Sequence, residues 1–224
     1  MAYAVIFDLD GTLADTMNDL KTGMNGMLTK LGYKNRTKAE LLRFINNGSR
    51  EFVRRSLPKG VQGEDFIIDS ALEVYNQEYA KCYCEKTEAF NGIVEMLEEL
   101  SKEGFKIGVL SNKQDRFVKD IIAKLFNIKL FGCVMGHSTL PPKPNPASAL
   151  AVAKKLGVKP SKCIFVGDSD VDMKTAINSG MKSIGVSWGY RNVTELKEAG
   201  AMYIAGEAGD IVKISKSIRD GDVK

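Results

Sequence analysis

The stretch Val5-Ile6-Phe7-Asp8-Leu9-Asp10-Gly11-Thr12 runs from an apolar, strand-like segment directly into two carboxylates. Negative charge concentrated at the end of a buried strand is unfavourable unless a cation or a proton neutralises it. The pair Asp8 and Asp10 therefore indicates a metal-assisted site. Taken alone, the pair also fits two exposed turn acids, because Asp-Gly is a strong turn signal.

Three later segments carry the polar groups that such a site requires. The apolar run at 105–110 ends in Ser111-Asn112, Lys143-Pro144 lies in a proline-rich loop, and Ile164-Phe165-Val166 continues into Gly167-Asp168-Ser169-Asp170-Val171-Asp172. Ligands of an open parallel sheet gather beyond the carboxyl ends of its strands. We therefore expect these segments to meet at one edge of a sheet.

Alternating strand and helix patterns predict a parallel α/β fold. The strand-like runs lie at 4–7, 106–110, 133–135, 163–166, 183–186 and 202–204. The amphipathic segments between them end at glycines that can adopt a left-handed cap, namely Gly104, Gly157, Gly180 and Gly200. Each of these segments is expected to be a helix that returns the chain to the sheet.

The segment at 15–87 interrupts this alternation, since it shows helical patterns and no convincing strand. Thr37-Lys38-Ala39-Glu40 fits a helix capping box, and apolar residues follow helical spacing from Asp65 to Tyr83. A direct crossover between parallel strands needs only about a dozen residues. We therefore predict an all-helical domain at 15–87, inserted into a core formed by 1–14 and 88–224.

Charge and hydropathy narrow the classes of function. The formal charge of +4 arises from 32 basic and 28 acidic side chains that are interleaved along the chain, so no nucleic-acid-binding arm is expected. No apolar run is long enough to suggest a membrane span, and the first strand lacks the features of a secretory signal. We therefore expect a cytoplasmic protein, whose oligomeric state the sequence leaves open.

Other common kinds of site lack their signatures. The four cysteines are not spaced as in a zinc site or a thioredoxin-like centre, and His137 is the only histidine. The chain also contains neither a P-loop motif nor the glycine fingerprint of dinucleotide-binding proteins. Nucleotide-driven transfer and dinucleotide redox chemistry are therefore disfavoured.

Together and in this order, the four polar segments resemble the haloacid dehalogenase superfamily of phosphatases, and the resemblance extends over nearly the whole chain. It implies a Rossmann-like core with the strand order 3-2-1-4-5. It also implies that the inserted helical domain is a cap that closes over the active site, with hinges near 12–16 and 85–91.

The same resemblance assigns roles to five residues. Asp8 corresponds to a nucleophile that forms an aspartyl-phosphate, and Asp10 corresponds to the general acid and base. Ser111 and Asn112 correspond to phosphate-binding groups, while Lys143 binds the phosphoryl group and stabilises its developing charge. The implied activity is hydrolysis of a phosphomonoester. A catalytically inactive binding protein on the same fold is the alternative from a different class, and the presence of all these groups disfavours it.

A magnesium cofactor is implied as well, held by Asp8, Asp168 and the backbone carbonyl of Asp10. Magnesium prefers oxygen ligands, which these residues supply. Asp172 is expected to lie behind this set of ligands, where it would orient the Lys143 ammonium or a metal-bound water.

The acidic cluster that begins at Asp168 has a second interpretation as an EF-hand calcium loop. Met173 and Ser179 stand where that loop requires Gly and Glu, so this interpretation is disfavoured. Asp170 is instead expected to be an acid in the first turn of a helix, where the helix dipole favours it.

Within the superfamily, the entry into the helical domain resembles the phosphoglycolate phosphatase group. The matching positions are Asp15-Thr16, Asp19-Leu20, Asn25 and Leu31-Gly32. Asn47-Gly48-Ser49-Arg50 resembles the specificity loop of that group's cap. Arg50 is therefore expected to bind the extra carboxylate of 2-phosphoglycolate through a two-point charged contact.

Several alternative substrates stay open, because pyrophosphatases and sugar-phosphate phosphatases share the same cap architecture. A β-phosphoglucomutase-like isomerase is less favoured, since that group carries a histidine twelve residues after the nucleophile, where this chain has Leu20. The expected partner is a small-molecule phosphate ester, with no nucleic acid and no membrane.

Overall fold

The computed structural model describes residues 2–221. They form two units, an α/β unit built from the described residues up to 14 and from 89 onwards, and a helical unit at 15–88. The two connections between the units pair with each other as a short two-stranded sheet of β2 (Ala14–Asp15) and β3 (Glu88–Ala89). No helix within the described residues has both the length and the apolar character needed to span a bilayer.

The α/β unit is built on a six-stranded parallel sheet in the order β5-β4-β1-β6-β7-β8. Its strands are β1 (Ala4–Phe7), β4 (Lys106–Gln114), β5 (Phe131–His137), β6 (Cys163–Gly167), β7 (Lys182–Val186) and β8 (Tyr203–Ala205). All six strand-like runs are confirmed. The order 3-2-1-4-5 is also confirmed, and β8 extends it by one strand at the edge.

The register of β1 brings the carboxyl ends of three strands together. Phe7 is paired with Val109 of β4 on one side and with Val166 of β6 on the other. The backbone N–H of Asp8 then donates to the Val166 carbonyl at 2.9 Å. The residues that follow Phe7, Val109 and Val166 therefore converge on one region of the sheet edge.

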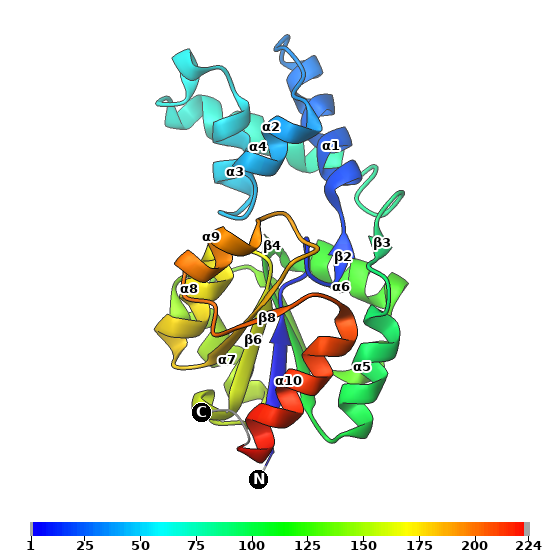
Figure 1. The fold of residues 1–224 in the computed structure, drawn as a ribbon. Coiled ribbons are helices and arrows are strands. Elements are labelled where there is room, and N and C mark those ends of the chain that lie inside the picture. Colours follow the sequence, from blue (N-terminus) through cyan, green and yellow to red (C-terminus); the bar gives the residue numbers. More distant parts are fainter. Residues whose placement is uncertain (1, 222–224) are drawn as a thin grey trace. The chain divides into compact units, whose positions relative to one another are not determined.

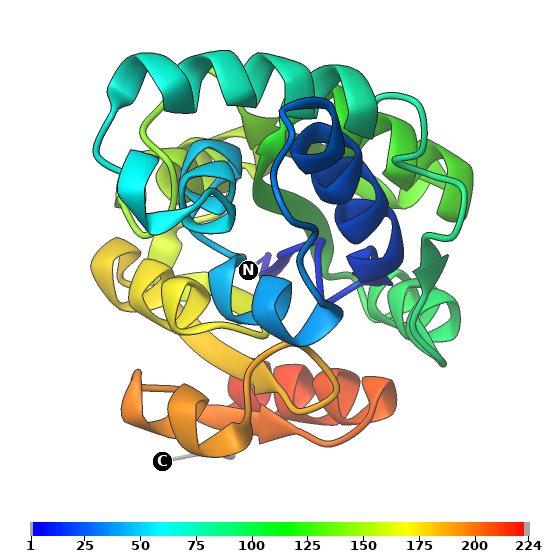
Figure 2. The same ribbon diagram turned by 90° about the horizontal axis from the view of Figure 1, so that it is seen from above.

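Helices cover both faces of this sheet (Figures 1 and 2). On one face α7 (Pro146–Leu156) and α8 (Asp170–Ser179) pack together, and on the other α5 (Ile93–Lys102) packs with α10 (Ala208–Asp220). The remaining helices are α6 (Asp115–Leu125), α9 (Val193–Glu198) and the short 3-10 turns Ile128–Leu130 and Pro160–Lys162.

The alternation of side chains along β1 shows why both faces need helices. Ala4 and Ile6 belong to the apolar cluster that includes Val152 of α7, whereas Val5 and Phe7 alternate with them and are equally buried. A strand buried on both faces is typical of a parallel sheet. The expected glycine caps are confirmed, because the four glycines that follow α5, α7, α8 and α9 all have positive φ, namely Gly104, Gly157, Gly180 and Gly200.

The helical unit contains α1 (Met17–Lys30), α2 (Lys38–Phe44), α3 (Ser49–Ser56), α4 (Asp65–Tyr79) and the turn Lys59–Val61. The capping box at Thr37 and Glu40 is confirmed at the start of α2. In α4, Tyr75 stacks on Tyr79 with ring centroids 5.6 Å apart. Gly23 of α1 has no room for a Cβ, which would lie 2.9 Å from the Tyr79 Cα, so α1 and α4 pack closely.

The helical spacing that continues to Tyr83 overestimates α4, which ends at Tyr79. The chain turns there and is held by Asp19 of α1. The Asp19 carboxylate accepts hydrogen bonds from the Lys86 N–H at 3.0 Å and from the Thr87 hydroxyl at 2.7 Å. These contacts give the buried Asp19 its partners and fix the end of the unit.

Candidate active site

Six charged side chains are buried among the described residues of the α/β unit, namely Asp8, Asp10, Lys113, Lys143, Asp168 and Asp172. All of them follow or end strands β1, β4 and β6, or lie close to the start of α7 or α8. The four carboxylates outnumber the two ammonium groups, so the cluster has two negative charges that these side chains do not balance. Burial of unbalanced charge is unfavourable, and such a cluster therefore marks a functional site.

Lys143 joins two of the carboxylates. Its Nζ lies 3.0 Å from Asp8 Oδ1 and 2.7 Å from Asp172 Oδ1. Burial alone would lower the pKa of Lys143, but the charges of Asp172 and Asp8 outweigh it and raise this pKa above the ordinary value. Lys143 is therefore a fixed positive charge beside Asp8.

Asp172 is held in place by the start of α8. Its Oδ2 accepts hydrogen bonds from the Ser169 N–H at 3.1 Å and from the Ser169 hydroxyl at 2.6 Å, which leaves Oδ1 directed at Lys143. Gly167 makes this arrangement possible, because a Cβ there would lie 2.3 Å from the Asp172 Cβ. The predicted contact of Asp172 with Lys143 is present. Asp170 is the first residue of α8, as expected.

Asp168 sits in a cradle formed by two loops. Its Oδ1 accepts a hydrogen bond from the Thr12 hydroxyl at 3.1 Å, and its Oδ2 accepts one from the Tyr190 N–H at 2.8 Å. Glycines supply the space, since a Cβ on Gly189 would lie 2.1 Å from the Asp168 Cβ and one on Gly11 would lie 2.4 Å from Asp168 Oδ2. The orientation of Asp168 is therefore fixed by residues far from it in sequence.

The structure adds Lys113, which sequence reasoning missed. Its Nζ lies 2.6 Å from Asp10 Oδ1, and only 5% of its side chain is exposed. The sequence signal that could have identified Lys113 was its position directly after Ser111-Asn112. Strand β4 continues through it to Gln114. Each carboxylate of the opening motif thus has a buried lysine of its own, Lys143 for Asp8 and Lys113 for Asp10.

The two predicted phosphate-binding residues of β4 lie in this region. Ser111 is buried, and its Oγ accepts a hydrogen bond from the Lys113 N–H at 3.2 Å. Asn112 uses both ends of its amide on the backbone of Lys143, accepting from its N–H at 2.8 Å and donating to its carbonyl at 3.0 Å. Asn112 therefore holds the Lys143 loop against β4.

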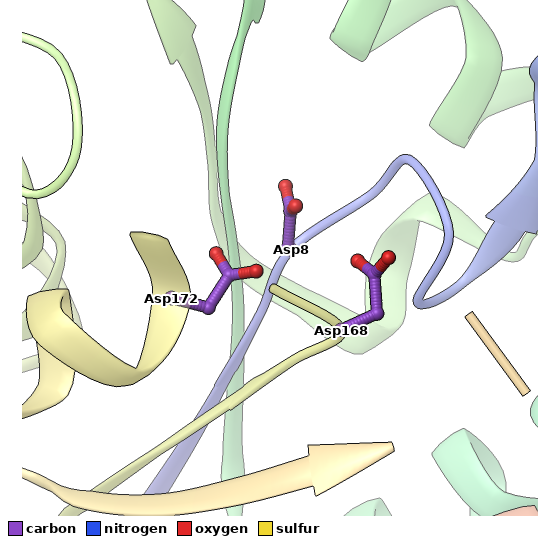
Figure 3. A group of neighbouring side chains, drawn as sticks. All are labelled: Asp8, Asp168 and Asp172. Carbon is purple, nitrogen blue, oxygen red and sulfur yellow. The ribbon is translucent and has the colours of Figure 1, made fainter. Parts of the chain in front are cut away.

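The acidic groups fit a divalent cation. One carboxylate oxygen from each of Asp8, Asp168 and Asp172 lies within 4.8 Å of the others (Figure 3). Burial raises the pKa of Asp8 from 3.8 to about 7, with the charges of Asp172 and Asp10 adding to this effect and Lys143 opposing it. Burial, Asp172 and Asp8 likewise hold the pKa of Asp168 well above its ordinary value. A bound cation would relieve this repulsion, and the all-oxygen donor set suits magnesium.

Arg50 lies on α3 in the helical unit, where it makes two ion pairs with α4. Its Nη2 is 2.6 Å from Asp65 Oδ1 and its Nε is 2.7 Å from Asp69 Oδ1. Asp69 and then Asp65 raise the pKa of Arg50 above its ordinary value. The guanidinium is thus already paired with two exposed carboxylates within its own unit.

Comparison with known proteins agrees with this geometry. The family model described as "Haloacid dehalogenase-like hydrolase" matches residues 5–186, a range that contains all six buried charges. A phosphoglycolate phosphatase from Pseudomonas fluorescens strain Pf0-1 is 34% identical over 198 residues, covering 87% of this chain and 72% of that protein. One from Psychrobacter arcticus is 33% identical over 200 residues, covering 87% of each chain.

Solved structures show the same architecture. A candidate phosphoglycolate phosphatase from Lactobacillus delbrueckii subsp. bulgaricus superposes with a TM-score of 0.87 at 30% identity, covering 97% of this chain and 99% of that one. A β-phosphoglucomutase from Clostridium difficile superposes with a TM-score of 0.77 at 23% identity over the whole of both chains. The fold is therefore shared by hydrolases and a mutase, and the substrate must be argued from the site.

Proposed function

Because the chain belongs to the haloacid dehalogenase-like hydrolases and is a phosphatase, we propose that it hydrolyses 2-phosphoglycolate with Asp8 as the nucleophile. One observation carries the mechanistic part of the proposal. Asp8 is a buried carboxylate held 3.0 Å from the ammonium of Lys143, at the edge of the sheet where ligands of parallel α/β folds gather.

The reaction has two displacements at phosphorus. In the first, Asp8 attacks the phosphorus, the bond to the ester oxygen breaks, and Asp10 gives a proton to the departing glycolate oxygen. In the second, Asp10 takes a proton from a water that attacks the phosphorus of the aspartyl-phosphate, which releases inorganic phosphate and restores the Asp8 carboxylate. Asp10 thereby regains the proton that it gave up in the first displacement.

Fixed charges stabilise both displacements. Lys143 places its ammonium beside the reacting carboxylate, where negative charge on the transferring phosphoryl group develops. Asp172 and Asn112 keep Lys143 there, through its ammonium and its backbone respectively. Ser111 is assigned to the phosphoryl oxygens, because a hydroxyl can donate to them.

Magnesium is the proposed cofactor, held by Asp8, Asp168 and the Asp10 carbonyl. When bound, it would screen the repulsion between the Asp8 carboxylate and the phosphate dianion. Asp172 is less suited as a ligand although it lies in the same acidic group, because its Oδ1 is paired with the charged Lys143 ammonium and its Oδ2 accepts both the N–H and the hydroxyl of Ser169. The partners of Asp168, in contrast, are the neutral donors of Thr12 and Tyr190. The Thr12 and Tyr190 contacts of Asp168 orient the carboxylate that would hold the ion.

The choice of 2-phosphoglycolate is supported by the relatives that carry that activity in their names at about one third identity. Arg50 is proposed to bind the substrate carboxylate, for which it would have to leave Asp65 and Asp69. Because both acids are exposed, these ion pairs contribute little free energy, and breaking them costs little. Leu20 stands in place of the histidine of β-phosphoglucomutase-like isomerases, which favours hydrolysis over phosphate retention.

The test is a magnesium-supported screen ranked by kcat/KM. It compares 2-phosphoglycolate with pyrophosphate, glucose 6-phosphate, a nucleoside monophosphate and an aryl phosphate, with Asp8→Asn as the inactive control. We expect 2-phosphoglycolate to rank first and Asp8→Asn to show no turnover. A different best substrate would overturn the substrate assignment alone, whereas wild-type rates in Asp8→Asn would overturn the covalent mechanism.

A further inference from the structure

Lys113 is a buried ammonium that the proposed reaction does not use. Its side chain is 5% exposed, and its Nζ lies 2.6 Å from Asp10 Oδ1, whose side chain is 12% exposed. Burying an ammonium is costly unless a paired group compensates it, and a chain can avoid that cost with an apolar residue. A lysine kept here therefore calls for a role beyond filling space.

The backbone around Asp10 is already fixed without Lys113. The Leu9 carbonyl accepts hydrogen bonds from the N–H groups of Leu13 and Ala14, both at 3.1 Å, and the Gly11 N–H donates to the Ala14 carbonyl at 2.9 Å. These bonds set the position of the Asp10 Cα but leave its side-chain torsions undetermined. The ion pair with Lys113, in contrast, acts on the Asp10 carboxylate itself.

We propose that Lys113 is a positioning residue that holds the Asp10 carboxylate in the orientation needed for proton transfer to the leaving oxygen. This inference rests on the proposed role of Asp10 as general acid and base. A proton donor has to lie within hydrogen-bond reach of the ester oxygen, and a displacement of about 1 Å can cost on the order of 100-fold in rate. Lys113 thus holds the side chain of Asp10, while its neighbour on β4, Asn112, holds the backbone of Lys143.

A purely structural ion pair would behave differently. If Lys113 only balanced charge in the core, its loss would lower the activity toward every ester by a similar factor. If it positions Asp10, its loss lowers kcat/KM, which reports the first displacement, only where departure of the leaving group needs a proton. An aryl ester such as 2,4-dinitrophenyl phosphate releases an anion that is stable without one, so it separates the two cases.

The experiment measures kcat/KM of Lys113→Met, Asp10→Asn and the double variant on two esters, with magnesium saturating for each variant. The esters are 2,4-dinitrophenyl phosphate and the best alkyl phosphate of the substrate screen. We expect Lys113→Met to lose about 100-fold on the alkyl ester and less than about fivefold on the aryl ester. In the Asp10→Asn background, adding Lys113→Met should change neither rate by more than about twofold, because the two residues act as one unit.

A matched control is Lys106→Met, which removes a lysine from the opposite end of β4, where its ammonium donates to the Leu156 carbonyl. It should leave both rates unchanged. Thermal melts accompany every variant, and Lys113→Gln replaces Lys113→Met if the latter does not fold. Equal losses on the two esters, or losses that multiply with those of Asp10→Asn, would overturn the positioning role. A wild-type enzyme without turnover, or an Asp8→Asn variant that keeps it, would instead overturn the proposed function.

Discussion

Thr12 donates a hydrogen bond from its hydroxyl to Asp168 across 156 positions of the chain, at 3.1 Å. The bond ties the end of the opening motif on β1 to the acidic segment after β6. Trp188 also holds Thr12 in place, because its indole N–H donates to the Thr12 carbonyl at 3.1 Å. The orientation of Asp168, which we propose as a magnesium ligand, therefore depends on a hydroxyl that is not itself proposed to touch the metal.

The first prediction concerns that hydroxyl. Thr12→Val keeps the shape of the side chain but removes the donor, so Asp168 loses one of its fixed contacts. We expect magnesium affinity, measured by calorimetric titration, to fall about 10-fold to 100-fold, the usual effect of changing a group that orients a metal ligand. Thr12→Ser restores a donor and should restore most of the affinity. Unchanged affinity in Thr12→Val would show that Asp168 is oriented without this bond.

The second prediction concerns Gly189, which is required for space and not for an unusual backbone conformation. A Cβ there would lie 2.1 Å from the Asp168 Cβ and 2.6 Å from the Gly11 carbonyl oxygen, so Gly189→Ala must displace the loop or Asp168. We expect a raised magnesium requirement for activity and a weaker calorimetric response to the ion.

Gly185→Ala provides the matched control for this change. The atoms nearest to a Cβ on Gly185 would be side-chain atoms of Ile204 and Leu196, at 3.0 and 3.1 Å, which do not belong to the acidic cluster. It should reduce thermal stability without altering the magnesium dependence. If both alanine variants changed stability alone, the close approach of Gly189 to Asp168 would have no functional consequence.

The third prediction follows from the pKa of Asp8, which burial raises from 3.8 to about 7. Between these two pH values the folded protein binds a proton that the unfolded chain has released. The free energy of unfolding of the metal-free protein should therefore fall as pH rises from about 4 to about 7, by up to roughly 4 kcal/mol from this group. Asp8→Asn removes the effect, because an amide does not titrate.

The measurement is denaturant unfolding of the wild type and Asp8→Asn in chelator at pH 5 and pH 8. We expect Asp8→Asn to be the more stable protein at pH 8 and its advantage to shrink at pH 5, where the wild-type carboxyl is protonated. Magnesium should stabilise the wild type more than the variant at pH 8, since the ion offsets the charge that burial disfavours. An advantage of the same size at both pH values would contradict the raised pKa of Asp8.

The sequence predicted the sheet well because its signals are local. Apolar runs of strand length and glycine caps depend on neighbouring residues only, and the end of each strand could be read from the polar residue that follows it. The predicted end of α4 was wrong because it depends on contacts with residues distant in sequence. Apolar spacing continues to Tyr83, but the chain turns after Tyr79, and Lys86 at the end of this turn region donates to Asp19 of α1.

The same difference between local signals and long-range contacts applies to the candidate site. The acids that follow β1 and β6 could be identified from the sequence, since strand ends of a parallel sheet converge. The contact of Lys113 with Asp10 and the use of both ends of the Asn112 amide on Lys143 could not, because they depend on side-chain torsions. Sequence patterns specify which face or end a residue occupies, but not which atom of a neighbour it binds.

The last prediction concerns Arg50, whose two ion pairs with Asp65 and Asp69 lie on the surface. Exposed pairs of this kind contribute about 0–1 kcal/mol, so Arg50→Ala should leave the thermal stability nearly unchanged. If Arg50 leaves these acids to bind the substrate carboxylate, Arg50→Ala should lower kcat/KM for 2-phosphoglycolate by about 10-fold to 100-fold, as expected for a lost charged hydrogen bond. For phenyl phosphate, which lacks the carboxylate, kcat/KM should fall far less.

Arg54→Ala is the matched control, because Arg54 lies on the same helix and pairs with Glu51 of that helix. Arg54→Ala should change kcat/KM for neither substrate. A similar loss on both substrates in Arg50→Ala would mean that Arg50 supports the helical unit through Asp65 and Asp69. No loss on either would leave Arg50 as a surface ion pair, and the preference for 2-phosphoglycolate would then need another residue to recognise its carboxylate.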